Sequence, residues 1–374
     1  MTERIKLASF TALMLLVLAS VGTGLSASLL EIAASFRIAP SRAGILYSLH
    51  FSGFLGFILL TLLVRGLRTR LILITIFAGV YVAALLTAGT TSVFMLLAAA
   101  LIFAGGAGGI IESHTTTLQV ITAVDEAEAG RIVSVTQAFF ALGALLAPVY
   151  LSLSQSYGDH QWRTLFIVLS VISAAAFLLG LSIKPERFHH PPTQNSAIRW
   201  RPVIRGCTAI GLYVGAEVVI FGWVPTVMQL YYDVPAARAK LAPTLFWMGI
   251  LGGRLVTARL TTRFSATALL RVLTLTGAAS SVLLVAVSSE PLLWLAVALA
   301  ALSFSGVWPL IIATTGSSGH ETVTTIAVAA GGLGASIFPY IAGRIAEFLP
   351  GPFILSVATP LLLIVFFLTR KTRV

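Results

Sequence analysis

A short polar stripe interrupts an otherwise apolar stretch in the first third of the chain. Glu112 is followed at three, four and seven residues by Thr115, Thr116 and Gln119. In an α-helix these spacings place the four side chains on one face. A carboxyl group beside hydroxyl and amide groups can take up a proton and hydrogen-bond a polar molecule. This stripe is therefore our first candidate site.

Two further glutamates lie in or beside apolar stretches. Glu217 has Tyr213 one helical turn before it, facing the same way. Three roles stay open for Glu217, namely a structural role, pairing with an arginine, and holding a sodium ion. Glu31 comes where the first apolar stretch ends, so it belongs either to a membrane span or to the hydrated headgroup region.

Aromatic and amide side chains would complete a binding site. An aromatic ring offers an apolar face on which a ring-bearing solute stacks, and amides hydrogen-bond its hydroxyl groups. The candidates of this kind are Trp223, Trp247, Trp308 and Gln137. Two basic residues, Arg254 and Arg263, follow a glycine-rich segment.

The composition requires a membrane to position these residues. Of the 374 residues, 57% are hydrophobic and only 10% are charged, whereas a soluble protein carries roughly 25% charged residues. The basic residues behind the net charge of +11 fall between apolar segments, which argues against nucleic-acid binding. The single cysteine, Cys207, excludes an internal disulfide. No cluster of catalytic residue types occurs, so we expect no enzyme, no cofactor and no metal site.

Breaks at charged, glycine and proline clusters predict an all-α membrane protein of about twelve helices. The predicted spans are 7–31, 41–63, 71–90, 93–122, 131–153, 163–183, 206–231, 239–258, 268–287, 291–314, 322–346 and 351–368. The polar segment 184–205 would link an N-terminal six-helix bundle, 1–183, to a C-terminal one, 206–374.

Lysine and arginine predict the orientation of these spans. With both termini in the cytoplasm, all but six of the 24 basic residues lie inside, as lysine and arginine resist translocation. The six outside are Arg37, Arg42, Arg163, Arg238, Lys240 and Arg344. We therefore predict a monomeric, multi-pass protein of the cell inner membrane.

The two halves resemble each other. Arg42, Gly53 and Gly56 recur as Arg238, Gly249 and Gly252 at one common spacing, and 141–144 with Pro148 recur as 332–335 with Pro339. Such duplicated membrane proteins hold a solute near the bilayer midplane between their repeats and rock one half against the other.

Several motifs resemble the major facilitator superfamily, in particular its fucose:proton symporter and sodium-dependent glucose transporter branch. They are Leu212–Val218 with Gly222-Trp223 and Pro225-Thr226, Gly105–Glu112, Gln137–Phe139 with Leu142-Gly143 and Pro148, Gly249–Arg254, and Ser305 with Trp308-Pro309. The family pattern has asparagines where this chain has Thr115 or Thr116 and Phe140.

The resemblance implies a secondary active transporter that moves a small solute, a sugar or sugar-like compound, by alternating access. It implies proton symport, with Glu31 and Glu112 as the proton-coupling pair. It also implies that Arg254 and Arg263, which resemble the family's inner-loop motif, act as a gating charge clamp. Glu112 would also bind the solute, together with Thr116, Gln119, Gln137, Tyr213, Glu217, Trp223, Trp247 and Trp308. The alternatives are sodium coupling, uncoupled uniport, and export of amphipathic compounds or metabolites by proton antiport.

Overall fold

The computed structural model describes residues 2–64, 66–122, 126–158, 160–184, 200–314, 321–349 and 351–369. These residues are helical apart from turns and short connections, and 12 of their helices are long and apolar enough to cross a membrane. The predicted fold class, an all-α membrane protein with about twelve spanning helices, is confirmed.

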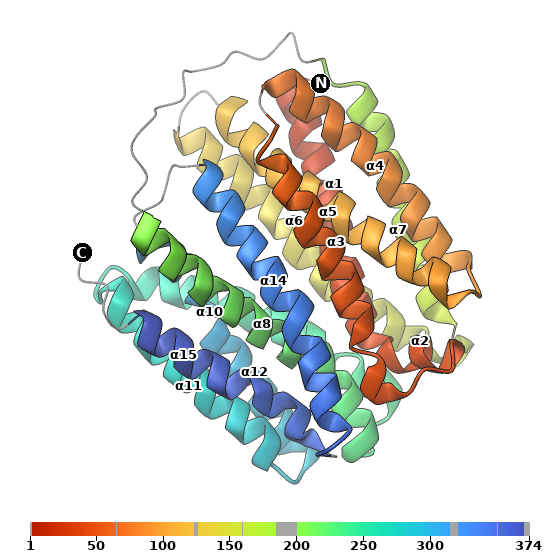
Figure 1. The fold of residues 1–374 in the computed structure, drawn as a ribbon, viewed down its shortest axis with the longest axis vertical. Helices are drawn as coiled ribbons and strands as arrows, with labels where there is room; N and C mark the ends of the chain where they lie inside the picture. The colour runs from red at the N-terminus through yellow and green to blue at the C-terminus, as the bar shows by residue number, and fades with distance from the viewer. Residues whose placement is uncertain are drawn as a thin grey trace.

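The first half of the chain supplies six long helices that pack on one another, at the upper right of Figure 1. They are α1 (Glu3–Ala27), α3 (Ile45–Thr61), α4 (Leu67–Thr90), α5 (Phe94–Thr122), α6 (Glu126–Leu153) and α7 (Gln161–Leu181). Three short elements join them, namely α2 (Leu29–Ser35), η1 (Pro40–Arg42) and η2 (Gln155–Tyr157).

The second half repeats this pattern at the lower left of Figure 1. Its elements are α8 (Trp200–Tyr231), α9 (Ala236–Ala239), α10 (Ala242–Leu260), α11 (Ala266–Ala286), α12 (Glu290–Phe304), α13 (Val307–Thr314), α14 (Glu321–Ala346), η4 (Pro352–Val357) and α15 (Ala358–Thr369). The halves meet mainly along three pairs of long helices, α3 with α14, α6 with α10, and α1 with α8.

The helix bounds differ from the predicted spans in three informative places. The first span ends at Ala27, and a separate helix, α2, carries Glu31. Helix α8 begins at Trp200, so the last residues of the predicted linker are helical, while residues 185–199 lie outside the described part. The tenth span is broken at Ser305-Gly306, which places Pro309 in the first turn of α13, where a missing N–H costs no hydrogen bond.

Glycines let paired helices approach closely. A Cβ on Gly143 of α6 would collide with the Leu16 carbonyl of α1, and a Cβ on Gly334 of α14 would collide with the Gly211 carbonyl of α8. Gly143 and Gly334 occupy equivalent positions in the two repeats. The glycine-rich segments therefore serve close helix packing, as small residues do in membranes.

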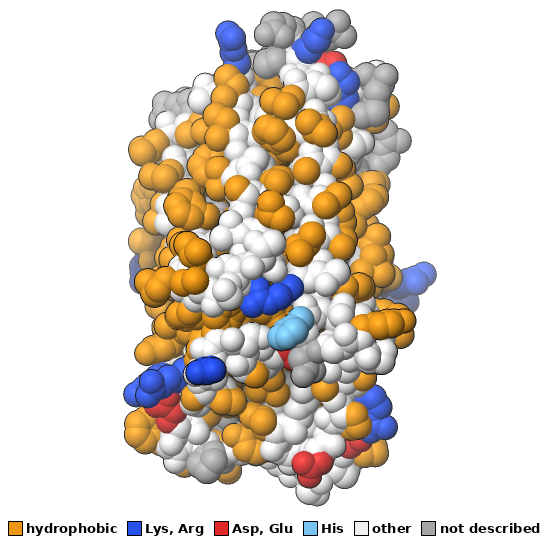
Figure 2. All heavy atoms as spheres, turned by 90° about the vertical axis from the view of Figure 1, so that its right-hand side faces the viewer, with side chains coloured by type: hydrophobic (Ala, Val, Ile, Leu, Met, Phe, Trp, Pro, Cys, Tyr) orange, Lys and Arg blue, Asp and Glu red, His pale blue; other side chains and the backbone are white. Residues whose placement is uncertain are grey.

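The surface has the pattern of a membrane protein. Figure 2 shows apolar side chains over most of one face, with basic and acidic side chains at its top and scattered over its lower half. Large apolar side chains such as Val171 and Leu255 are 66% and 70% exposed, a state that suits lipid rather than water.

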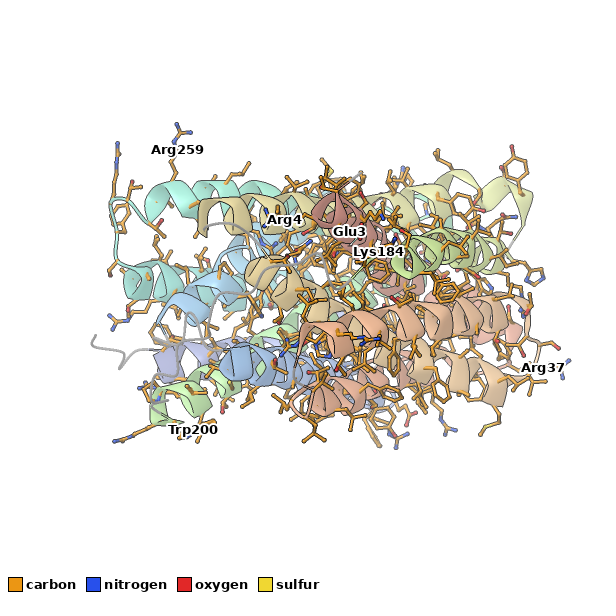
Figure 3. The ribbon with its side chains drawn as sticks, turned by 90° about the horizontal axis from the view of Figure 1, so that it is seen from above. Glu3, Arg4, Arg37, Lys184, Trp200 and Arg259 are labelled. Atoms are coloured by element: carbon orange, nitrogen blue, oxygen red, sulfur yellow. The ribbon has the colours of Figure 1, made fainter. Side chains whose placement is uncertain are left out.

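The spanning helices run between two ends of the molecule. We call the end where α1 begins and α15 ends the terminal end, and the end that carries α2, η1, η2 and α9 the distal end. In Figure 3 Arg259 and Trp200 lie at the terminal end of the molecule, and Arg37 lies at the distal end, on the opposite side of the view. At the terminal end Glu3 accepts a hydrogen bond from the Lys184 backbone N–H at 2.7 Å, which joins the start of α1 to the residues after α7.

Candidate functional site

Glu112 lies on α5 with its side chain partly exposed. Gly108, one turn earlier, packs against Leu18 of α1 and Tyr81 of α4. The Tyr81 hydroxyl is buried, interacts electrostatically with Glu112, and has no hydrogen-bond partner among the described residues. The Glu112 carboxylate likewise makes no hydrogen bond or ion pair with any described residue. It is therefore free to accept a proton or a solute hydroxyl.

The rest of the polar stripe is partly as predicted. The Gln119 side chain is buried, and its Oε1 accepts a hydrogen bond from Thr136 Oγ1 of α6 at 3.2 Å. Gln137, the next residue on α6, is partly exposed. Thr115 instead donates to the Ile111 carbonyl at 2.6 Å within its own helix. The side chain of Thr116 lies outside the described part of the chain.

Glu217 lies on α8 and is held by its neighbours. The Tyr213 hydroxyl is 2.7 Å from Glu217 Oε1 and 3.0 Å from the Phe304 carbonyl oxygen, so its one proton serves one of these acceptors at a time. Arg254 of α10 interacts electrostatically with both Glu217 and Tyr213. Of the roles left open for Glu217, a nearby arginine is thus present, although the two side chains form no ion pair.

Trp247 of α10 lies between the two halves. Its ring is 5.5 Å from that of Phe140 on α6 and 6.0 Å from that of Phe221 on α8, measured between centroids. Its indole N–H is buried and has no hydrogen-bond partner among the described residues. Phe140 stands where the resembling family has asparagine, so an aromatic pair occupies a position where that family places an amide.

The other two tryptophans differ from Trp247. Trp223 is 1% exposed, donates to the Pro339 carbonyl at 3.1 Å and packs against Gly44 and Gly343. It lies six residues beyond Glu217, or about 9 Å further along α8 toward the distal end. In this state Trp223 is a packing residue between the halves. Trp308 is partly exposed in the first turn of α13.

Glu31 lies at the distal end, far from Glu112. About 27 Å of helix rise separates Glu112 from Phe94, where α5 begins at that end. Glu31 Oε1 is 2.7 Å from the Nζ of Lys240, which lies between α9 and α10. The structure therefore does not bring the two predicted proton-coupling residues together, and their joint role stays a prediction.

The two predicted clamp residues, Arg254 and Arg263, are both exposed near the terminal end of α10. Neither forms an ion pair with a described residue. The described residues also contain no group of three or more histidine, cysteine or acidic side chains that could hold a metal ion.

Three residues that contact the candidate residues were not predicted from the sequence. They are Tyr81 near Glu112, Phe140 beside Trp247, and Lys240 paired with Glu31. Phe140 carried a signal, because it departs from the family pattern. Lys240 carried none, since a lysine between two spans usually lies in water.

Comparisons with known proteins agree with this architecture. The family model described as "Major Facilitator Superfamily" matches residues 10–339. No curated protein sequence matches the chain. Among solved structures, FucP in the outward conformation, a major facilitator transporter, covers 100% of both chains at 15% identity with a TM-score of 0.69.

Two further structures have the same fold. A D-xylose-proton symporter matches with a TM-score of 0.81 at 13% identity, covering 99% of this chain and 98% of its own. A single-site mutant of the nucleoside transporter NupG matches with a TM-score of 0.75 at 12% identity, covering 99% and 100%. These identities support the fold alone. With the family model matching most of its length, the chain belongs to the Major Facilitator Superfamily of transporters.

Proposed function

We propose that this transporter carries a small polar solute by alternating access, in symport with protons. The observation that carries the proposal is Glu112, a partly exposed carboxylate inside a spanning helix with no hydrogen-bond or ion-pair partner among the described residues. An ionisable side chain in a membrane span carries a free-energy cost, so its presence there marks a candidate functional site. A carboxyl group in this position can take a proton from one side and release it to the other as the two halves rock.

Polar and aromatic side chains on α5, α6 and α10 favour a solute that has hydroxyl groups and an apolar face. Gln119 and Gln137 offer amides, and the Trp247 indole N–H is an unused donor beside an aromatic pair. Proteins of similar structure are named for fucose, xylose and nucleosides, which are ring-bearing, hydroxyl-rich compounds. A sugar or sugar-like solute is therefore the class we propose.

Reconstituted protein tests this proposal directly. Purified protein is first screened for thermal stabilisation by sugars, nucleosides and organic acids, because a ligand that binds the folded state raises its melting temperature. The stabilising solute is then added outside proteoliposomes that contain the protein, and its uptake is measured with and without an imposed pH gradient. We expect accumulation that depends on the gradient and collapses with a protonophore. Accumulation that ignores the gradient, or that follows a sodium gradient, would disprove proton symport.

A second candidate function is export of amphipathic compounds by proton antiport. The contact of Phe140 with Trp247 favours it, since an apolar aromatic pair binds a hydrophobic ring better than a sugar hydroxyl. Aromatic, amphipathic compounds in place of sugars should then stabilise the purified protein. Their efflux from proteoliposomes should be driven by a pH gradient that moves protons inward as the compound leaves.

We further propose the cell inner membrane as the location, with the terminal end in the cytoplasm and the protein monomeric. Arg37 and Arg259 are exposed at the distal and terminal ends. In a Cys207→Ala background, a membrane-impermeant thiol reagent added to intact cells should label Arg37→Cys and spare Arg259→Cys. Labelling in the reverse order would overturn the orientation.

A further inference from the structure

The two halves meet at the distal end through contacts that repeat with the internal duplication. At the spacing that relates Arg42 to Arg238, Ser48 of α3 corresponds to Thr244 of α10. Ser48 Oγ donates to the Ser336 carbonyl of α14 at 2.6 Å, and Thr244 Oγ1 donates to the Leu145 carbonyl of α6 at 3.1 Å. Leu145 and Ser336 are themselves equivalent, each three residues before the proline of its helix. The distal seams α3–α14 and α6–α10 are thus built on one plan.

A second pair of equivalent contacts extends this plan. Ser152 at the end of α6 donates to the Ala237 carbonyl of α9 at 2.7 Å. The corresponding residues in the other seam are Gly343 of α14 and Ser41 of η1, and a Cβ on Gly343 would collide with the Ser41 carbonyl. Both seams therefore bring helix ends from opposite halves into direct contact at the distal end, and we call this arrangement the distal-closed state.

The symmetry fails at one position. Gly44, at the start of the α3–α14 seam, packs so closely that a Cβ would lie 2.7 Å from the Pro339 carbonyl oxygen and 2.8 Å from the Trp223 ring. Its counterpart in the α6–α10 seam is Lys240. The Lys240 ammonium binds Glu31 of α2 at 2.7 Å and also donates to the side chain of Gln155 in η2. We call Glu31, Gln155 and Lys240 the distal latch.

The distal latch differs from Arg42–Glu347, the other ion pair that joins the halves among the described residues. The side chains of Lys240 and Glu31 are 3% and 9% exposed, whereas Arg42 and Glu347, paired across the α3–α14 seam, are 69% and 21% exposed. An exposed pair contributes little. A buried pair is different, because removing one partner leaves a charge out of water with nothing to balance it.

We propose that Lys240 is a gating residue, and that Glu31 and Lys240 together set the balance between distal-closed and distal-open states of the transporter. This inference rests on the proposed alternating access. When the halves part at the distal end, both charges gain water, so the closed state is disfavoured when one of the two charges is left buried without its partner. Glu31 then acts in opening the molecule, and its role is separate from that of Glu112.

The physics of a buried pair predicts an unusual pattern of variants. Glu31→Gln leaves Lys240 charged and buried in the closed state, so it should shift the ratio of open to closed molecules by on the order of 100-fold. Lys240→Gln leaves Glu31 in the same position and should act in the same direction. The double variant buries no charge, so it should return to the closed state, as should the exchanged pair Glu31→Lys with Lys240→Glu.

Spin labels on the two halves measure this balance without knowledge of the solute. Met95 at the start of α5 and Leu292 at the start of α12 are 73% and 50% exposed at the distal end. Both are changed to cysteine in a Cys207→Ala background, and distances are measured by pulsed electron paramagnetic resonance. We expect one short distance in the parent protein, a longer one in each single variant, and the short one again in the double variant.

A wedge variant separates this inference from the proposed function. Gly44→Trp should force the α3–α14 seam apart, since no room exists there even for a Cβ. If the wedge lengthens the distance and the single latch variants do not, the latch is overturned and alternating access stands. If neither changes it, alternating access itself fails. For any variant too unstable to purify, labelling of Ser48→Cys in cells by an impermeant thiol reagent gives the same readout, and unchanged labelling overturns the latch.

Discussion

The glutamates of the two halves, Glu112 on α5 and Glu217 on α8, differ in what surrounds them. Glu217 is hydrogen-bonded by Tyr213 at 2.7 Å and lies within the field of Arg254. Among the described residues, Glu112 interacts electrostatically with the unpaired Tyr81 hydroxyl and accepts no hydrogen bond. A carboxylate that already has a hydrogen-bond donor is held in one position. A carboxylate without a donor is available to bind a proton or a solute hydroxyl. We infer that the first half supplies the proton site and the second half supplies a fixed surface.

Glu112→Gln should have the largest effect. The amide cannot exchange a proton, so uptake driven by a pH gradient should fall to the level of empty liposomes. Solute exchange between equal concentrations on both sides should persist, because it needs no net proton movement. The measurement compares gradient-driven uptake with equilibrium exchange of labelled solute in the same proteoliposomes. Full uptake by this variant would remove Glu112 from the coupling mechanism.

Glu217→Gln is the matched control in the other half. We expect this variant to weaken solute binding about tenfold, the value of one charged hydrogen bond. Because Tyr213 already holds Glu217, we expect the pH dependence of uptake to stay intact. Titration of thermal stability against the solute gives the affinity. Equal loss of coupling in both Gln variants would break the contrast between the halves.

Trp247→Ala should come next, through the aromatic contact with Phe140. We expect a solute with a ring to bind about three- to tenfold more weakly, in line with the energy of one aromatic contact, and Trp247→Phe to keep most of the affinity. Binding isotherms for the three proteins provide the comparison. An unchanged affinity in Trp247→Ala would place the solute away from the α6–α10 seam.

Tyr213→Phe should have the smallest effect. It removes one hydroxyl and leaves the Glu217 side chain without its donor, which costs about 1 kcal/mol of stability. A small decrease in melting temperature, together with normal gradient-driven uptake, is the expected result. Loss of uptake without loss of stability would instead assign Glu217 a direct part in transport, and would narrow the difference from Glu112.

Helix periodicity and apolar length were enough to predict the spans, because a helix in lipid must satisfy its backbone within itself over about twenty residues. The same periodicity placed Glu112 and Gln119 on one face and Tyr213 beside Glu217. It failed for Thr115, whose hydroxyl turns back to the Ile111 carbonyl, since threonine in a helix has this local partner available.

The amino-acid sequence by itself determined the membrane class, the twelve spans, the duplication and the family, because each depends on residue type and spacing along the chain. Only the tertiary structure decided which charges meet. Glu31 and Lys240 are far apart in sequence, and no residue pattern linked the two, yet they form a buried pair because parts of both halves pack around them. The burial of a charge depends on what packs against it from elsewhere, and no local pattern contains that information.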